Sequence, residues 1–176
     1  MEGEDIISDI LLRRAAPEDA GEYTACHIAC WQSAYRGIVP DEYLDGMNAE
    51  LEERTEKRRQ YIIDPDREDY CVMLDDKMIG FLVYGKGRDE DKADSGEVCG
   101  IYLRGEYWDR GYGSRMMKFA IEGLKRAGYR EAFLWVLEEN ARAKKFYEKH
   151  GFAPDGASKT IELGKPLIEL RYMRSI

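Results

Sequence analysis

The chain has 176 residues, of which 44% are hydrophobic and 35% are charged, a composition typical of one soluble globular domain. Its 35 acidic and 27 basic residues give a net charge of −8, which argues against nonspecific binding to nucleic acid or to an anionic membrane. No apolar run approaches the length of a membrane span, and residues 1–8 are acidic where an export signal would be basic and then apolar. We therefore expect a cytoplasmic protein with an acidic tail at 1–8 and a single domain at 9–176.

Four cysteines are scattered through the chain, and without an export signal they indicate a reducing compartment. Cys26, His27 and Cys30 fall close together on a predicted helix. The chain has only two histidines and no second cysteine pair to complete a tetrahedral metal site, so we predict no metal site and interpret both cysteines as core residues. His27 is predicted to pack or to form a hydrogen bond, with a role as a base as the alternative.

The first half of the chain predicts a strand, two helical regions and a hairpin. Pro17 and the carboxylates after it are typical of a helix start, and the glycine and proline within 36–40 end that helix. Residues 85–96 are polar, acidic and without periodicity, and predict a mobile loop. The expected elements are a strand at 9–14, helices at about 17–35 and 41–63, and strands at 70–74 and 78–84.

The second half predicts alternating strands and helices, followed by a closing hairpin. Gly128 and Gly151 stand where C-terminal helix caps are expected. The expected elements are a strand at 98–103, a helix at 113–127, a strand at 132–137, a helix at 141–150, and strands at 157–163 and 167–173.

A turn with two glycines joins the strand 98–103 to the helix 113–127. Its sequence, residues 107–115, is YWDRGYGSR. Glycine lets a ligand approach the backbone, and the free N–H groups of a first helical turn can hold phosphate without a cationic side chain. A tight turn that needs a positive φ explains the same glycines without any ligand. Neither a dinucleotide-binding turn nor a Walker loop fits, because Met116 replaces the third glycine and no Gly-Lys-Ser/Thr follows.

A second segment makes the turn more informative. Residues 134–152, LWVLEENARAKKFYEKHGF, combine a strand, a helix opened by Asn140, a Phe-Tyr pair and a Gly-Phe end. This segment resembles the closing half of the GCN5-related N-acetyltransferase (GNAT) family, and 110–113 looks like the pyrophosphate loop of that family at the expected distance upstream. The resemblance runs from about Ile10 to the C-terminus. One difference is Trp108, where the family usually has Gln or Arg, so one side-chain contact is missing.

The resemblance implies an α/β (α+β) fold with one mixed, mostly antiparallel sheet, splayed central strands and about four flanking helices. In this family acetyl-coenzyme A (acetyl-CoA) enters the gap between the fourth and fifth strands, here 98–103 and 132–137. A splayed strand leaves backbone N–H groups unpaired, which is costly unless a ligand satisfies them. The domain 9–176 is therefore expected to be a GNAT acetyltransferase domain.

The resemblance also assigns the cofactor contacts. The backbone of 101–103 would bind the pantetheine arm and polarise the thioester carbonyl, which is an oxyanion-type contribution. Asn140 is a good helix cap, and the family places this asparagine against the pantetheine, so both roles are compatible. The residues implied in cofactor binding are Ile101, Tyr102, Leu103, Arg110, Gly111, Tyr112, Gly113, Ser114, Asn140, Phe146 and Tyr147.

The implied reaction is direct acetyl transfer from the thioester to a primary amine. The family uses the tyrosine at Tyr147 to reprotonate the departing thiolate, whereas a core role is the alternative for both Phe146 and Tyr147. The amine must lose a proton, so a base or a water chain is required. Glu97 matches the position of a catalytic glutamate in many members. A solvated glutamate at a strand entrance, with a water relay in its place, is the alternative reading.

The acceptor wall is expected from the connection between the first two helices and from the C-terminal hairpin, and it includes Trp31, Tyr35, Arg36 and Ile38. A small metabolite, antibiotic, polyamine or peptide N-terminus all fit as the amine, and the sequence leaves a homodimer open. A functional alternative of another class is a catalytically idle domain that binds acyl-CoA as a sensor or partner-docking module.

Overall fold

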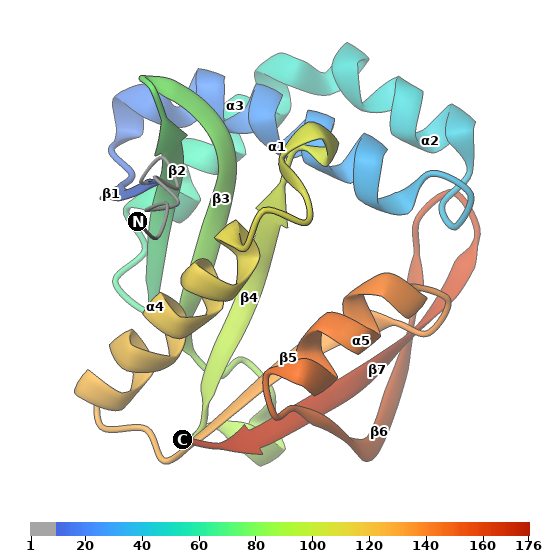
Figure 1. Cartoon of the computed structure of the whole chain (residues 1–176). Helices are drawn as coiled ribbons and strands as arrows, with labels where there is room; N and C mark the ends of the chain where they lie inside the picture. Colours follow the sequence, from blue (N-terminus) through green and yellow to red (C-terminus); the bar gives the residue numbers. More distant parts are fainter. Residues whose placement is uncertain (1–9) are drawn as a thin grey trace, which may run out of the picture.

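A computed structural model describes residues 10–176 (Figure 1). The predicted acidic tail at 1–8, and Asp9 at the predicted start of the first strand, lie outside the described residues. The helices and strands are β1 (Leu11–Arg14), α1 (Ala20–Tyr35), α2 (Asp41–Gly46), α3 (Leu51–Ile62), β2 (Arg67–Leu74), β3 (Lys77–Lys86), β4 (Gly96–Leu103), α4 (Tyr112–Arg126), β5 (Glu131–Leu137), α5 (Ala141–Lys149), β6 (Ala153–Glu162) and β7 (Pro166–Ser175).

The strands form one seven-stranded sheet in the order β1-β2-β3-β4-β5-β7-β6. All neighbours are antiparallel except β4 and β5, which run parallel and pair only through Gly96 with Ala132 and Glu97 with Phe133. Beyond Glu97 the two strands diverge, so the edge of β4 that faces β5 has no strand partner within 10–176 (Figure 1). The predicted mixed sheet with splayed central strands is confirmed.

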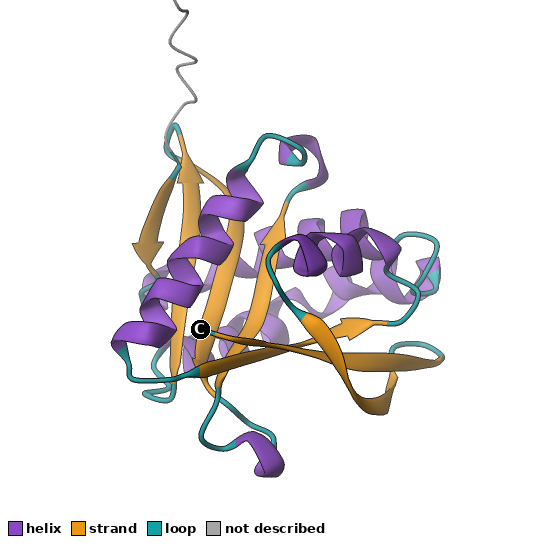
Figure 2. Ribbon diagram, turned by 60° about the horizontal axis from the view of Figure 1, so that its bottom comes forward, coloured by secondary structure: helices purple, strands orange, loops and turns teal. Residues whose placement is uncertain are grey.

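Helices cover both faces of the sheet, with α4 and α5 on one face and α1 and α3 on the other (Figures 1 and 2). The larger core lies between the sheet and α4, where Met116, Ala120 and Leu124 recur at the spacing of one helix face and are fully buried. A second core packs α1 and Ile62 of α3 against β3. The sheet is therefore a rigid support on which the ends of β4 and β5 open to one side.

Part of the polar segment 85–96, predicted as a mobile loop, has regular structure. Strand β3 continues to Lys86, and Glu90–Lys92 form a one-turn 3₁₀ helix. Asp89 and Asp91 both bind the guanidinium of Arg171 on β7, which is only 6% exposed. These contacts could not be predicted from the segment itself, because Arg171 lies about 80 residues later in the chain.

No helix within 10–176 is both long and apolar enough to span a membrane. The four cysteines are free, and Cys26 and Cys30 are buried in the second core as predicted. The His27 Nδ1 atom lies 2.8 Å from a guanidinium nitrogen of Arg58. Burial and the neighbouring positive charges of Arg58 and Arg54 lower the pKa of His27 to about 3, so this histidine is neutral at physiological pH.

Candidate active site

A cavity of about 840 Å³ occupies the space between the splayed ends of β4 and β5. Its wall is formed by the end of α1, by β4, by the first turn of α4, by the end of β5 and by α5. A smaller hollow of about 370 Å³ lies between β2–β3 and the end of α4 and contains none of the predicted site residues. The larger cavity is therefore the candidate active site.

The predicted pantetheine strand lines this cavity through Ile101, Tyr102 and Leu103. Since no strand pairs with this edge of β4 within the described residues, its backbone polar groups are available to a bound molecule. The carbonyl of Leu103 is an exception, because it accepts a hydrogen bond of 2.9 Å from the indole N–H of Trp108.

The glycine turn lies at the first turn of α4, as predicted. Gly111 has a φ of 80°, in the left-handed region, and a Cβ there would meet nothing within 4 Å. A Cβ on Gly113 would lie 3.3 Å from the ring of Phe146, so this glycine lets α4 and α5 pack closely. No side chain of residues 10–176 caps the start of α4, so its first N–H groups are open to an anion. Gly111, Gly113 and Ser114 line the cavity.

Two residues of the predicted phosphate loop do not line the cavity. Arg110 is exposed, and its guanidinium donates to the carbonyl of Glu106 at 2.9 Å. Tyr112 is 4% exposed and belongs to the larger core. Any contribution of these two residues to phosphate binding would therefore come from their backbone.

Trp108, the residue that departs from the family pattern, forms part of the cavity wall. The guanidinium of Arg142 on α5 lies 4.4 Å from the centre of its ring. Arg142 also binds Asp109 at 2.9 Å, and Asp109 has a φ of 60°. The tryptophan therefore ties the loop before α4 to both β4 and α5.

Helix α5 presents the predicted cofactor residues from both of its halves, Asn140 at its N-terminus and Phe146 and Tyr147 in its second half. Asn140 caps the helix, because its Oδ1 accepts the N–H of Ala143 at 3.1 Å. It also lines the cavity, and its amide nitrogen donates to no described residue. Phe146 lines the cavity beside the α4 turn.

Tyr147 is half-buried at the wall of the cavity. Its hydroxyl forms no hydrogen bond with any residue of the described chain, which is unusual for a phenol in such a place. Burial, with a smaller effect of Tyr102, raises the pKa of Tyr147 above the usual value for tyrosine. The phenol therefore stays protonated and has its proton free for a ligand.

The predicted acceptor wall is only partly at the cavity. Tyr35, Arg36 and Ile38 line it, whereas Trp31 does not. The hydroxyls of Tyr35 and Tyr102 are 2.5 Å apart. The guanidinium of Arg36 binds two carboxylates of α2, Asp41 at 3.1 Å and Asp45 at 3.0 Å, so its charge is largely balanced.

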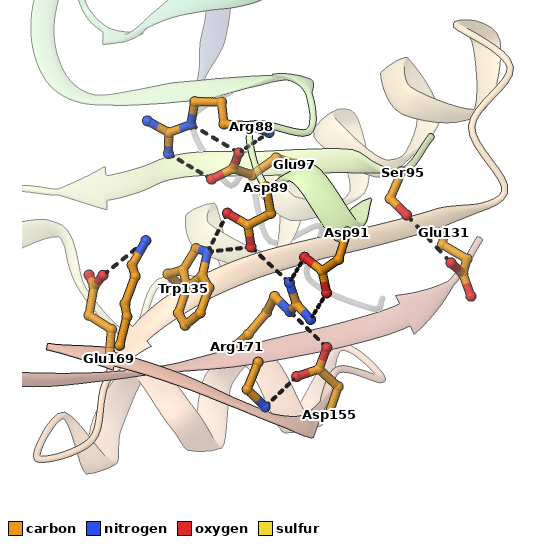
Figure 3. A network of polar contacts seen from close by, with 12 residues as sticks. Arg88, Asp89, Asp91, Ser95, Glu97, Glu131, Trp135, Asp155, Glu169 and Arg171 are labelled. Atoms are coloured by element: carbon orange, nitrogen blue, oxygen red, sulfur yellow. Dashed lines mark hydrogen bonds and ion pairs between the residues drawn. The ribbon is translucent and has the colours of Figure 1, made fainter. Parts of the chain in front are cut away.

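The structure does not bring Glu97 to the cavity. The residue is 1% exposed and lies where β4 and β5 are still paired. Both carboxylate oxygens accept from Arg88, with nitrogen–oxygen distances of 2.6 and 3.0 Å (Figure 3). This bidentate ion pair leaves little of the carboxylate free for an amine.

Several cavity residues were missed at the sequence level. Trp135 was predicted only as a residue of the strand 132–137, but it lines the cavity, and its indole N–H donates to Asp89 at 3.1 Å (Figure 3). Lys145 and Lys149 also line the cavity and have no ion pair within the described residues. Their four-residue spacing on the helix opened by Asn140 is a signal that could have placed them on one face.

Residues 30–152 match the sequence model of the family described as the acetyltransferase (GNAT) family. The uncharacterized N-acetyltransferase YuaI of Bacillus subtilis is 29% identical over 134 residues, which cover 74% of this chain and 73% of the relative. Spermidine N(1)-acetyltransferase of Thermoplasma acidophilum is 24% identical over 146 residues, which cover 81% and 88%. The crystal structure of PaiA N-acetyltransferase from Thermoplasma acidophilum in complex with coenzyme A has a TM-score of 0.76 at 22% identity. It shares the fold over 96% of this chain and 99% of that one.

Proposed function

The chain belongs to the acetyltransferase (GNAT) family, and from that premise we propose that it transfers an acetyl group directly from acetyl-CoA to a primary amine of a small molecule or peptide. One observation carries the proposal. The cavity joins three features that a thioester cofactor would use and that no other described residue occupies, namely the unpaired edge of β4, the uncapped start of α4 and the free hydroxyl of Tyr147.

The residues present fit such a cofactor. The first N–H groups of α4, at 112–114, would hold the pyrophosphate, because the helix dipole favours an anion there. The backbone of 101–103 and the amide nitrogen of Asn140 would bind the pantetheine arm. When bound, acetyl-CoA supplies the thioester carbonyl carbon that the amine attacks.

Two groups would then stabilise the reaction. Backbone N–H groups of β4 would donate to the thioester oxygen, on which negative charge builds in the tetrahedral intermediate. As the carbon–sulfur bond breaks, Tyr147 would donate its proton to the sulfur. The attacking nitrogen loses one proton, and we assign its removal to water because Glu97 is held by Arg88 away from the cavity. Water would then return one proton to Tyr147, so that the proton lost by the amine balances the proton gained by the sulfur.

The same position of Glu97 favours a second candidate, a catalytically idle domain that binds acyl-CoA as a sensor or docking module. One experiment separates the two. The protein is incubated with acetyl-CoA and, in turn, spermidine, an aminoglycoside and a tripeptide with a free N-terminus. Release of the coenzyme A thiol and the mass of the product are then measured. We expect amine-dependent thiol release with acetylation of at least one amine, whereas coenzyme A binding in calorimetry without such release would favour the idle domain.

A further inference from the structure

Two phenol hydroxyls meet at the end of the cavity that faces α1. Tyr102 comes from the splayed strand β4 and Tyr35 from the last turn of α1, and their oxygen atoms are 2.5 Å apart. Both residues line the cavity, and Tyr35 is only 9% exposed. The sequence interpretation used only the backbone of Tyr102, so its hydroxyl has no role in the function proposed above.

Neighbouring rings hold this pair in place. The ring of Tyr102 stacks on Phe81, with centroids 5.0 Å apart and an angle of 23° between the planes. Tyr35 meets Trp31 edge to face at 5.1 Å. Because both rings are packed in this way, the two hydroxyls cannot separate without disturbing the core behind them. Trp31 therefore supports the cavity wall through Tyr35, although it does not line the cavity itself.

The pair of hydroxyls offers the cavity a hydrogen-bond acceptor. Each phenol has one O–H donor and two acceptor lone pairs. Burial raises the pKa of both hydroxyls, so both stay neutral near neutral pH, and one of their two protons fills the bond between them. When Tyr102 donates to Tyr35, the oxygen of Tyr102 has free lone pairs and directs no proton toward the cavity.

A nucleophilic amine needs such a partner. Its lone pair must stay free for the attack, so it can be held only through its N–H groups. A phenol proton would bind that lone pair and block the attack, and a carboxylate would favour the ammonium form, which cannot attack. Among the described residues, the part of the wall that comes from α1, the loop after it and Tyr102 consists of Ser33, Ala34, Tyr35, Arg36, Ile38 and Tyr102 and includes no carboxylate. The carboxylates that line the cavity, Asp109 and Glu139, belong to the segments before α4 and α5. Glu169 on β7 acts on both hydroxyls through its charge but does not line the cavity.

We propose that the hydroxyl oxygen of Tyr102 accepts an N–H hydrogen bond from the acceptor amine, and that Tyr35 positions this oxygen by accepting the Tyr102 proton. The inference rests on the proposed acetyl transfer to an amine. The nitrogen gains positive charge as it attacks, so its N–H becomes a stronger donor and the bond strengthens toward the transition state. Tyr102 is then a catalytic residue and Tyr35 a positioning residue.

Two coenzyme A analogues test this hydrogen bond even though the amine substrate is not identified. In the first, S-(N-propylcarbamoylmethyl)-coenzyme A, the amide N–H stands in for the N–H of the amine. In the second, the propyl ester, an oxygen replaces this N–H. Calorimetry gives the affinity of both analogues for the wild type, Tyr102→Phe and Tyr35→Phe. We expect the wild type to prefer the amide by roughly five- to tenfold, which is the weight of one net hydrogen bond, and both variants to lose this preference.

Tyr172→Phe is the matched control. It deletes a buried phenol hydroxyl that donates to Glu148 at 3.3 Å and does not line the cavity, so the preference should persist. Unfolding temperatures establish that each variant is folded. A wild type without a preference, or a preference that survives in both cavity variants, overturns the proposal while leaving acetyl transfer intact. A wild type that binds neither coenzyme A nor the analogues refutes the proposed function and with it this inference.

Discussion

At the scale of single residues, Tyr147 has the two properties that a general acid for a thiolate needs. Its hydroxyl has no hydrogen-bond partner in the described chain, so its proton is free. Burial raises its pKa, so it stays protonated across the physiological range and beyond it. A purely structural tyrosine would instead use its hydroxyl in a hydrogen bond, as Tyr172 does with Glu148.

We therefore expect Tyr147→Phe to lower kcat by about 10²- to 10⁴-fold, the usual range for a lost general acid, while coenzyme A still binds. The loss appears in kcat because the proton transfer belongs to the transition state. Tyr172→Phe serves again as the control, and its kcat should stay near that of the wild type. If Tyr147→Phe kept full kcat while chemistry limits the rate, we would conclude that Tyr147 only packs in the wall and that water is the general acid.

The same residue predicts a pH dependence. A raised pKa means that the protonated, acid-competent phenol persists to higher pH than in an ordinary tyrosine. We expect kcat to fall on the alkaline side only above about pH 10, the ordinary tyrosine value, and this limb to vanish in Tyr147→Phe. Steady-state kinetics across an alkaline pH series measure this fall in kcat. If the fall is unchanged in Tyr147→Phe, another group titrates there.

At the scale of elements, the turn before α4 can be tested without confusing backbone strain with ligand contact. Gly111→Val adds a side chain where the pyrophosphate is proposed to approach, at a φ of 80° that valine resists. We expect coenzyme A affinity to fall by at least roughly tenfold. Gly128→Val is the control, because its φ of 95° gives the same strain at the far end of α4, with open space around it. Calorimetry should show a loss only for Gly111→Val, and equal losses would remove the phosphate from this turn.

A second element, the segment 85–96, is held by Arg171 on β7. Its guanidinium binds Asp89, Asp91 and Asp155 at 2.7–2.9 Å (Figure 3). Asp89 also accepts the indole N–H of Trp135, a residue of the cavity wall. The ion pairs therefore connect the β3–β4 segment, β6 and β7 to that wall.

These ion pairs predict that the folded protein loses stability at acidic pH. The Arg171 guanidinium lowers the pKa of Asp91 below its usual value. A carboxylate with a lowered pKa in the folded state adds stability above its unfolded pKa of about 4, and this stability is lost as pH falls through the folded value. We expect the wild-type unfolding temperature to drop below about pH 4 and Arg171→Met to be less stable at pH 7 with a weaker acid dependence. Thermal unfolding between about pH 2 and 7 measures both, and parallel curves would contradict the assignment.

At the scale of the whole molecule, what the sequence could predict depended on how far apart the interacting residues are. The strands, the helix starts and the glycine turn follow from neighbours within one or two helical turns, and most of these elements were predicted correctly. The family pattern added the splayed strands. Arg88 and Glu97 are only nine positions apart, but their contact depends on how the segment between β3 and β4 folds back, which no local pattern gives. The contact of Asp89 with Arg171 spans 82 positions. The Tyr35–Tyr102 pair, 67 positions apart, could not be read locally for the same reason.

The charge distribution of the whole chain gives the last prediction. The net charge is −8, yet Lys145 and Lys149 line the cavity without an ion pair in the described chain. They lie four residues apart on α5, where like charges repel each other, so a polyanion such as coenzyme A would relieve this repulsion. Because these side chains are exposed, their attraction is screened by salt.

We expect coenzyme A affinity to fall several-fold as NaCl rises from about 0.05 to 0.5 M, and the double variant Lys145→Gln/Lys149→Gln to bind more weakly at low salt with a flatter salt dependence. Lys144→Gln removes a charge from the same helix at a position that does not line the cavity, so it controls for general charge and for helix stability. Calorimetry across the salt series gives each slope. If Lys144→Gln flattened the salt dependence of affinity as much per charge removed as the double variant does, the attraction would come from the overall charge of α5. The two cavity lysines would then have no specific part in holding the phosphates.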